Sequence, residues 1–376
     1  MGVPRDALAV QERAIRRADR AAAISLRLWR GMDVADLDSS WESVGPKVAA
    51  ATETVARRNV AAAGTFTSTL ARADGLAGDS VNAEAFVGVD GSGRPLDGAL
   101  RGAVVTTKQA IGAGMSLVDA MLAGGTYLTV MVKSAISDLE RSGSATAATG
   151  KGYVRYVRLV NPGACSRCAI QAGSDRFSTD FDRHPACRCS TVPVRGDIPS
   201  GFITTPDDYF ASLSPAEQDR VFTKSGAEAI RAGADPVAVV NARRGANRKR
   251  MDGVRTYSPS RIQRSVIGRG ADGRPIFGYV TTEGGTRRGT YGRTQERLGA
   301  EVVRGSGRYS RVIRPRLMPE SIIPLTEDVE MRRILLRDAG YLRPDARMDV
   351  RERWAQQRRD KDAADAFYRS KGIGVT

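Results

Sequence analysis

Histidine is almost absent from this 376-residue sequence, in which His184 is the only one. A single imidazole cannot be both a metal ligand and a general base, which removes most of the argument for a Ser-His-Asp hydrolase. The sequence also lacks a G-x-S-x-G nucleophile elbow and a G-x-x-x-x-G-K-S/T phosphate-binding loop. These absences favour a structural or interaction protein over an enzyme.

Long apolar runs are lacking as well. The most apolar stretch, 117–136, contains Asp119 and Lys133 and is interrupted by the glycine pair at 124–125. Charges within so short a segment make a membrane span unfavourable, and we predict a buried pair of helices there. Residues 1–20 carry charges throughout and have no apolar core segment, so we expect no secretory signal peptide and no membrane association.

The few cysteines are concentrated in one place. All four fall with the histidine in the 25-residue stretch CSRCAIQAGSDRFSTDFDRHPACRC, which supplies Cys165, Cys168, His184, Cys187 and Cys189. Thiolate and imidazole ligands in two short groups separated by a loop suit zinc, which takes four ligands in a closed tetrahedron where its role is structural. Five candidates for four places leave one of His184, Cys187 or Cys189 outside the coordination sphere, and the sequence does not say which.

Two other interpretations of this cluster remain open. In a secreted protein, four cysteines could form disulfides in three different pairings. A bound zinc could also be catalytic, but a catalytic zinc keeps an open coordination position, and a cysteine-rich ligand set is typical of structural sites. We therefore predict a structural zinc, without which the local module of residues 153–196 unfolds.

The spacing of these residues resembles that of a known family. The run VNPGACSRC at 160–168, followed by HPACRC at 184–189 and VPV at 192–194, is similar to the C-x-x-C…H-P-x-C-x-C…P-V signature of MuF-like phage head-morphogenesis proteins. Residues 207–245 and RPRLMPESI at 314–322 resemble the form of this family found in phages of actinobacteria. The cysteine and histidine block is the specific part of the resemblance, whereas the N-terminal region matches only in its helical character.

The resemblance implies a minor capsid protein of a tailed phage, located inside the head near the portal. Its expected partners are the portal and major capsid proteins and packaged double-stranded DNA, and it would pass through the host cytoplasm during assembly. The alternative is a capsid maturation protease, or another enzyme fused to a MuF-like domain. A zinc-dependent regulator that reads DNA sequence is not favoured, because the basic part of the chain lacks a recognition-helix pattern.

Positive charge is concentrated in the segment 243–316. It contains 19 Arg and Lys against five acidic residues, and so carries +14 of the net charge of +16. Arginines interleaved with tyrosines and glycines indicate contact with phosphates without base reading, although a solvated basic surface is the alternative. The residues that we predict to contact nucleic acid are Arg243, Arg244, Arg248, Lys249, Arg250, Arg287 and Arg288.

The rest of the pattern predicts a predominantly α-helical (α+β) protein. Apolar residues at helical spacing predict a helical N-terminal domain, 1–150, which begins with two helices packed as a hairpin across the turn at 31–40. A MuF-like domain, 151–245, follows; it contains the small zinc-stapled α+β module, and the sequence SPAE at 214–217 predicts a capped helix start. A basic, loop-rich Arg/Gly segment, 246–316, and C-terminal helices, 317–376, complete the chain.

Overall fold

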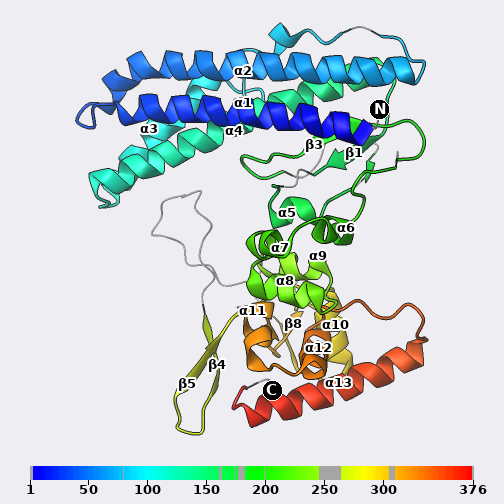
Figure 1. The fold of residues 1–376 in the computed structure, drawn as a ribbon. Helices are drawn as coiled ribbons and strands as arrows, with labels where there is room; N and C mark the ends of the chain where they lie inside the picture. Colours follow the sequence, from blue (N-terminus) through cyan, green and yellow to red (C-terminus); the bar gives the residue numbers. More distant parts are fainter. Residues whose placement is uncertain are drawn as a thin grey trace. The chain divides into compact units, whose positions relative to one another are not determined.

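The computed structural model describes residues 3–78, 80–160, 163–173, 175–176, 183–198, 200–244, 264–304 and 310–374. The chain separates into two compact units, of which the first extends to Thr205 and the second starts at Pro206 (Figure 1). Both units are mostly helical and carry small sheets, which confirms the predominantly α-helical class.

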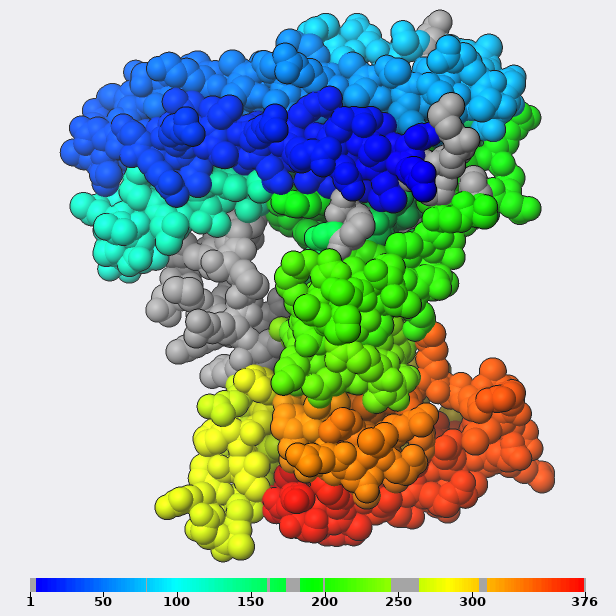
Figure 2. Space-filling model, viewed as in Figure 1, coloured from blue at the N-terminus to red at the C-terminus, as the bar shows by residue number. Residues whose placement is uncertain are grey.

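Four helices build most of the first unit: α1 (Val3–Arg30), α2 (Leu37–Ala73), α3 (Leu96–Gly112) and α4 (Leu117–Gly150). α1 and α2 lie side by side, as the periodicity of their apolar residues predicts (Figure 2). Trp29, Val48, Leu100 and Ile136 come from these four helices, one from each, and are at most 1% exposed in their shared core. Burial of such side chains stabilises the unit by about 1.5–3 kcal/mol each.

The prediction of two helices at 117–136 is wrong, because α4 continues through the glycine pair at 124–125 without a break. The glycines are needed for close packing. A Cβ atom on Gly124 would lie 2.0 Å from the Thr107 hydroxyl and 2.5 Å from the Trp29 ring, and one on Gly125 would lie 3.0 Å from that ring. Among the described residues, no helix combines the length and the apolar character that a membrane crossing requires.

A small antiparallel sheet follows α4 in the chain. β1 (Tyr156–Leu159) is its central strand, flanked by β2 (Asp175–Arg176) and β3 (Ser190–Pro193). Val157 of β1 pairs with Val192 of β3, and both are buried in a cluster with Ala7 of α1, against which Phe66 of α2 packs. The sheet is therefore part of the first unit, and the chain leaves β1 and enters β3 close to the cysteines.

The second unit is built mainly from short helices. Tyr209, Ile322, Leu335 and Tyr341 are fully buried in it. The capped start predicted at Ser214 is present, since its hydroxyl accepts the backbone N–H of Glu217 and the Glu217 side chain binds back to the Ser214 N–H. The helices are α6 (Pro206–Ala211), α7 (Pro215–Phe222), α8 (Lys224–Arg231), α9 (Pro236–Ala242), α10 (Thr290–Arg297), α11 (Pro319–Ile322), α12 (Val329–Asp338) and α13 (Val350–Ser370).

The described part of the basic segment is more regular than the loop-rich region we predicted. Besides α10, it holds three two-stranded antiparallel ladders, β4 (Ser265–Arg269) with β5 (Pro275–Gly278), β6 (Val280–Thr281) with β9 (Arg316–Leu317), and β7 (Val302–Arg304) with β8 (Ser310–Val312). Glycine supplies the sharp turns between short strands; Gly273, for example, has a φ of 76° in the β4–β5 hairpin. The predicted division of the chain into segments 1–150, 151–245, 246–316 and 317–376 stays a prediction. Its boundary at 245 lies outside the described residues.

Candidate metal centre and basic surface

The first pair of cysteines lies on a single helical turn, α5 (Ser166–Ala169). The Cys165 carbonyl accepts hydrogen bonds of 3.0 Å from the backbone N–H groups of Cys168 and Ala169. This closed turn directs the two sulfurs to one side, which is the knuckle expected from a C-x-x-C spacing.

The second group of donors lies on the turn that leads into β3. The backbone N–H of Cys187 donates to the His184 carbonyl at 3.1 Å, and Ala186 between them has a φ of 57°. That left-handed conformation is unusual for alanine. A hydrogen bond to α4 holds Ala186 in this conformation, since the Ser134 hydroxyl accepts the Ala186 N–H at 2.7 Å.

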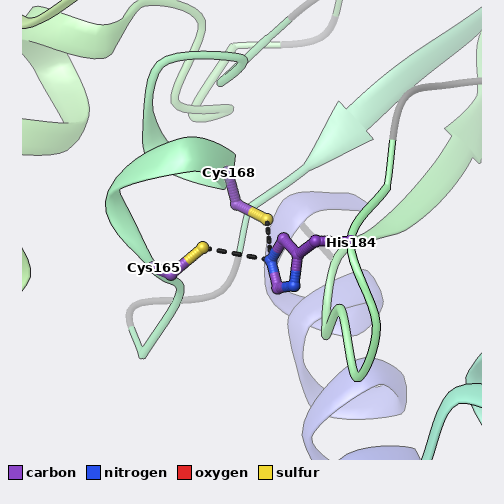
Figure 3. Close-up of side chains that lie close together, drawn as sticks. All are labelled: Cys165, Cys168 and His184. Atoms are coloured by element: carbon purple, nitrogen blue, oxygen red, sulfur yellow. Dashed lines mark hydrogen bonds between the residues drawn. The ribbon is translucent and has the colours of Figure 1, made fainter. Parts of the chain in front are cut away.

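The two groups of donors converge. The His184 Nε2 atom lies 3.0 Å from the Cys165 sulfur and 3.3 Å from the Cys168 sulfur (Figure 3). The Cys168 sulfur lies 3.5 Å from that of Cys187. Bonds of ~2.3 Å to sulfur and ~2.0 Å to nitrogen place the ligand atoms of a tetrahedral zinc roughly 3.5–3.8 Å apart, so the five side chains cluster at a spacing that could bind a metal.

Cys168 occupies the central place in this cluster. The donor atoms lie within 4.8 Å of one another in two sets of three, one with Cys165 and His184 and the other with Cys187 and Cys189. Cys168 belongs to both sets. It is buried, as are Cys187 and Cys189, whereas Cys165 is exposed.

The histidine is oriented by its own backbone. Its Nδ1 atom lies 2.8 Å from the Pro185 carbonyl. A carbonyl only accepts, so Nδ1 carries a proton, and Nε2 is the ring atom that faces the sulfurs and would bind a metal after losing its own proton. Metal-binding histidines are commonly held in this way.

The protonation equilibria of the cluster are divided, since the pKa values of Cys165 and Cys187 are lowered, whereas those of Cys168 and Cys189 are raised. Hydrogen bonds with Cys168 and then with His184 lower the pKa of Cys165 to about 4, while the bond with Cys165 raises the pKa of His184 to about 9. Hydrogen bonds from Cys168 and Cys189 lower the pKa of Cys187 well below the usual range of a thiol. A metal binds the thiolate and the neutral imidazole, so the cluster offers two thiolates and a cation would displace the remaining protons.

A buried arginine stands beside the sulfurs. Arg158 of β1 is 3% exposed, and its guanidinium lies 3.8 Å from the Cys168 sulfur and 4.0 Å from the Cys187 sulfur. Burial alone would lower the pKa of Arg158, but the neighbouring cysteine sulfurs raise it above the usual value. A buried cation at this position offsets the excess negative charge of a cysteine-rich metal site.

Two further side chains hold the cysteine-bearing turn to the helices. Arg141 of α4 donates to the carbonyls of Cys187 at 3.3 Å and Cys189 at 2.8 Å. Gln11 of α1 donates to the carbonyls of Leu159 and Arg188, both at 3.1 Å. Sequence reasoning missed Arg158, Arg141 and Gln11. Only the charge of Arg158 within the apolar strand YVRLV could have signalled a role.

The disulfide alternative is not adopted in the structure, where all four cysteines of the chain are free thiols. The 3.5 Å between the sulfurs of Cys168 and Cys187 is far longer than the roughly 2.05 Å of a disulfide bond.

Of the seven predicted nucleic-acid contacts, four lie among the described residues, two at the end of α9 and two before α10. Arg243 forms an ion pair with Glu320, and Arg244 is exposed at the end of α9. Arg287 and Arg288 are exposed in the turn before α10. Arg248, Lys249 and Arg250 lie outside the described residues.

Two arginines of the basic segment are buried and structural, so its charge is not all available to a ligand. Arg314 binds Asp338 at 2.8 Å and Asp365 at 2.5 Å. Arg316 lies over the Tyr341 ring, 4.4 Å from its centroid, and donates to the Ala339 carbonyl. Counting charge along the sequence cannot distinguish such residues from exposed ones.

The chain matches no protein-family model, no curated protein and no solved structure.

Proposed function

We propose that the cluster holds one structural zinc ion, bound by Cys165, Cys168, His184 and sulfur from the Cys187–Cys189 pair. All donors come from the protein, and three of the four cysteines are buried. This composition suits a closed tetrahedron and leaves no position for a substrate. The ion would cross-link the α5 turn to the turn before β3.

We further propose that the protein is a MuF-like minor capsid protein of a tailed phage. The observation that carries the proposal is the convergence of the residues of the C-x-x-C…H-P-x-C-x-C pattern in one cluster. The protein would lie inside the head near the portal, in contact with the portal and major capsid proteins. Its basic second unit would bind packaged double-stranded DNA without sequence preference and assist assembly or genome delivery.

Mass spectrometry of purified phage particles tests this function. The chain should be a low-abundance component of particles made with the wild-type gene and be lost from particles made with Cys168→Ser. Arg167→Ala, which removes an exposed neighbour on the same turn, serves as the matched control and should be incorporated normally. Absence of the wild-type chain from particles would contradict the proposal.

The same particles distinguish the enzyme alternative. A maturation protease would leave a defined cleavage in the major capsid protein, and this cleavage would be lost in a variant that is folded and incorporated. We expect the length of the major capsid protein to be independent of this chain.

A further inference from the structure

Four arginines of the second unit line one open hollow of about 430 Å³. Its other lining residues are Thr286, Glu296 and Ser310. The described lining residues include four guanidinium groups and one carboxylate and so carry a formal charge of +3. The arginines are Arg287, Arg288, Arg293 and Arg297.

The backbone around the hollow is built to bring these side chains together. The turn before α10 folds back on the helix, since the Gly292 N–H donates to the Gly284 carbonyl at 2.8 Å. A Cβ atom on Gly292 would lie 2.1 Å from the Thr286 carbonyl oxygen, so only glycine permits this approach. The Arg287 N–H donates to the Ser310 carbonyl at 3.1 Å, which ties the turn to β8.

The spacing of the arginines in α10 is unfavourable for an isolated helix. Arg293 and Arg297 are four residues apart and share one helix face, where like charges destabilise a helix by about 0.2–0.5 kcal/mol. Arg297 is positioned by the Trp354 ring, whose centroid lies 5.2 Å from its guanidinium carbon. Within the part of the chain that the structure describes, the Arg293 side chain makes no ion pair or hydrogen bond. Its charge is available to a ligand.

Glu296 limits the positive charge of the hollow. Its carboxylate lies 2.8 Å from the Arg287 guanidinium and is the only acid among the described lining residues. A bound anion would compete with Glu296 for Arg287.

We infer that this hollow is a binding site for the phosphodiester backbone of duplex DNA. Guanidinium forks bind phosphate oxygens in a planar, bidentate manner, and the serine and threonine hydroxyls add neutral donors. Among the described residues that line the hollow there is no aromatic ring, so these residues supply no stacking platform of the kind that single-strand binding uses. The inference rests on the proposed function, because it assigns the DNA contact of that protein to these four arginines.

Binding of a random-sequence DNA duplex to the full chain, measured by fluorescence anisotropy at several salt concentrations, tests the inference. Replacement of Arg288 and Arg293 together by glutamine should weaken binding to every sequence. It should also reduce the slope of log affinity against log salt by about 1.8, since each phosphate contact contributes ~0.9. Glu296→Gln should strengthen binding, because it frees Arg287.

Arg274→Gln with Arg347→Gln is the matched control. It removes the same charge from the same unit, at side chains 87% and 92% exposed that do not line the hollow, and should leave the slope unchanged. An equal loss in both double variants would overturn the inference and leave general DNA binding intact. If the Arg288 and Arg293 variant lost affinity for single-stranded DNA but not for duplex DNA, the assignment of duplex DNA as the ligand would be wrong. If the wild-type chain binds no DNA, the DNA-binding part of the proposed function fails as well.

Discussion

The Arg141 guanidinium donates a hydrogen bond of 2.8 Å to the backbone carbonyl of Cys189. The two residues are 48 positions apart in the chain. Arg141 lies in α4, and Cys189 directly precedes β3. This bond and its neighbour to the Cys187 carbonyl fasten the cysteine-bearing turn to the helices without any metal. The cysteine-bearing turn is thus attached to α4, and the zinc that we propose would add a cross-link within the cluster.

Arg141→Ala should lower the free energy of unfolding of the first unit by about 3–6 kcal/mol, because it removes two hydrogen bonds from a charged donor, each of which contributes about 1.5–3 kcal/mol. Urea denaturation followed by circular dichroism measures the change. Arg183→Ala is the comparison, since Arg183 is partly exposed and also pairs with Asp138, the partner of Arg141 on α4. It should cost about 1 kcal/mol or less, and an equal cost for both would contradict the role given to Arg141.

Arg158→Met should weaken zinc binding by roughly 10–100-fold, the effect typical of losing a residue that supports metal ligands. The reason is that the variant lacks the guanidinium that lies beside the sulfurs of Cys168 and Cys187. Competition with a chromophoric chelator measures the affinity. Arg158→Lys keeps the positive charge and should retain most of the zinc affinity. An unchanged affinity in the methionine variant would show that Arg158 does not support the site.

Gly124→Ala should destabilise the four-helix core by about 1–3 kcal/mol, since the added methyl group meets the Thr107 hydroxyl and the Trp29 ring. Gly98→Ala is the matched change in α3, where a Cβ atom meets nothing within 4 Å. That variant should be more stable than the wild type by about 0.5–1 kcal/mol. Thermal unfolding of the two variants should therefore shift in opposite directions, and shifts of the same sign would argue against the packing described.

Arg314→Gln should destabilise the second unit by about 3–5 kcal/mol, because it leaves the buried carboxylates of Asp338 and Asp365 without their shared cation. Arg347→Gln changes a side chain that is 92% exposed and should alter stability by about 0.5 kcal/mol or less. Calorimetry of the full chain measures both. DNA binding that fell in Arg314→Gln while its stability was unchanged would show that Arg314 is a ligand contact.

The sequence was sufficient for features that depend on local spacing. The helical periodicity of α1 and α2, the capped start of α7 at Ser214 and the turn that carries Cys165 and Cys168 all follow from residues a few positions apart. The convergence of the cysteines with His184 could also be predicted, since no other set of metal ligands of this kind is available in the sequence.

Features that depend on distant partners could not be predicted. The glycine pair at 124–125 resembles a helix break in the sequence, and its packing reason becomes visible only once Trp29 is placed against it. In the sequence, Arg314 and Arg316 look like their exposed neighbours. The burial of these two arginines depends on acidic and aromatic side chains that lie in α12 and α13 or directly after α12. The support of the metal cluster by Arg141 likewise joins segments that are far apart in the chain.

Metal analysis of the purified full chain, combined with X-ray absorption at the zinc edge, tests the central claim most directly. The account predicts about one zinc per chain, with three sulfur ligands at ~2.3 Å and one nitrogen ligand at ~2.0 Å. Cys168→Ser should lose most of the zinc, because Cys168 belongs to both sets of donors, whereas Arg167→Ala should keep it. A chain that folds normally without metal and whose cysteines are found as disulfides would contradict the account.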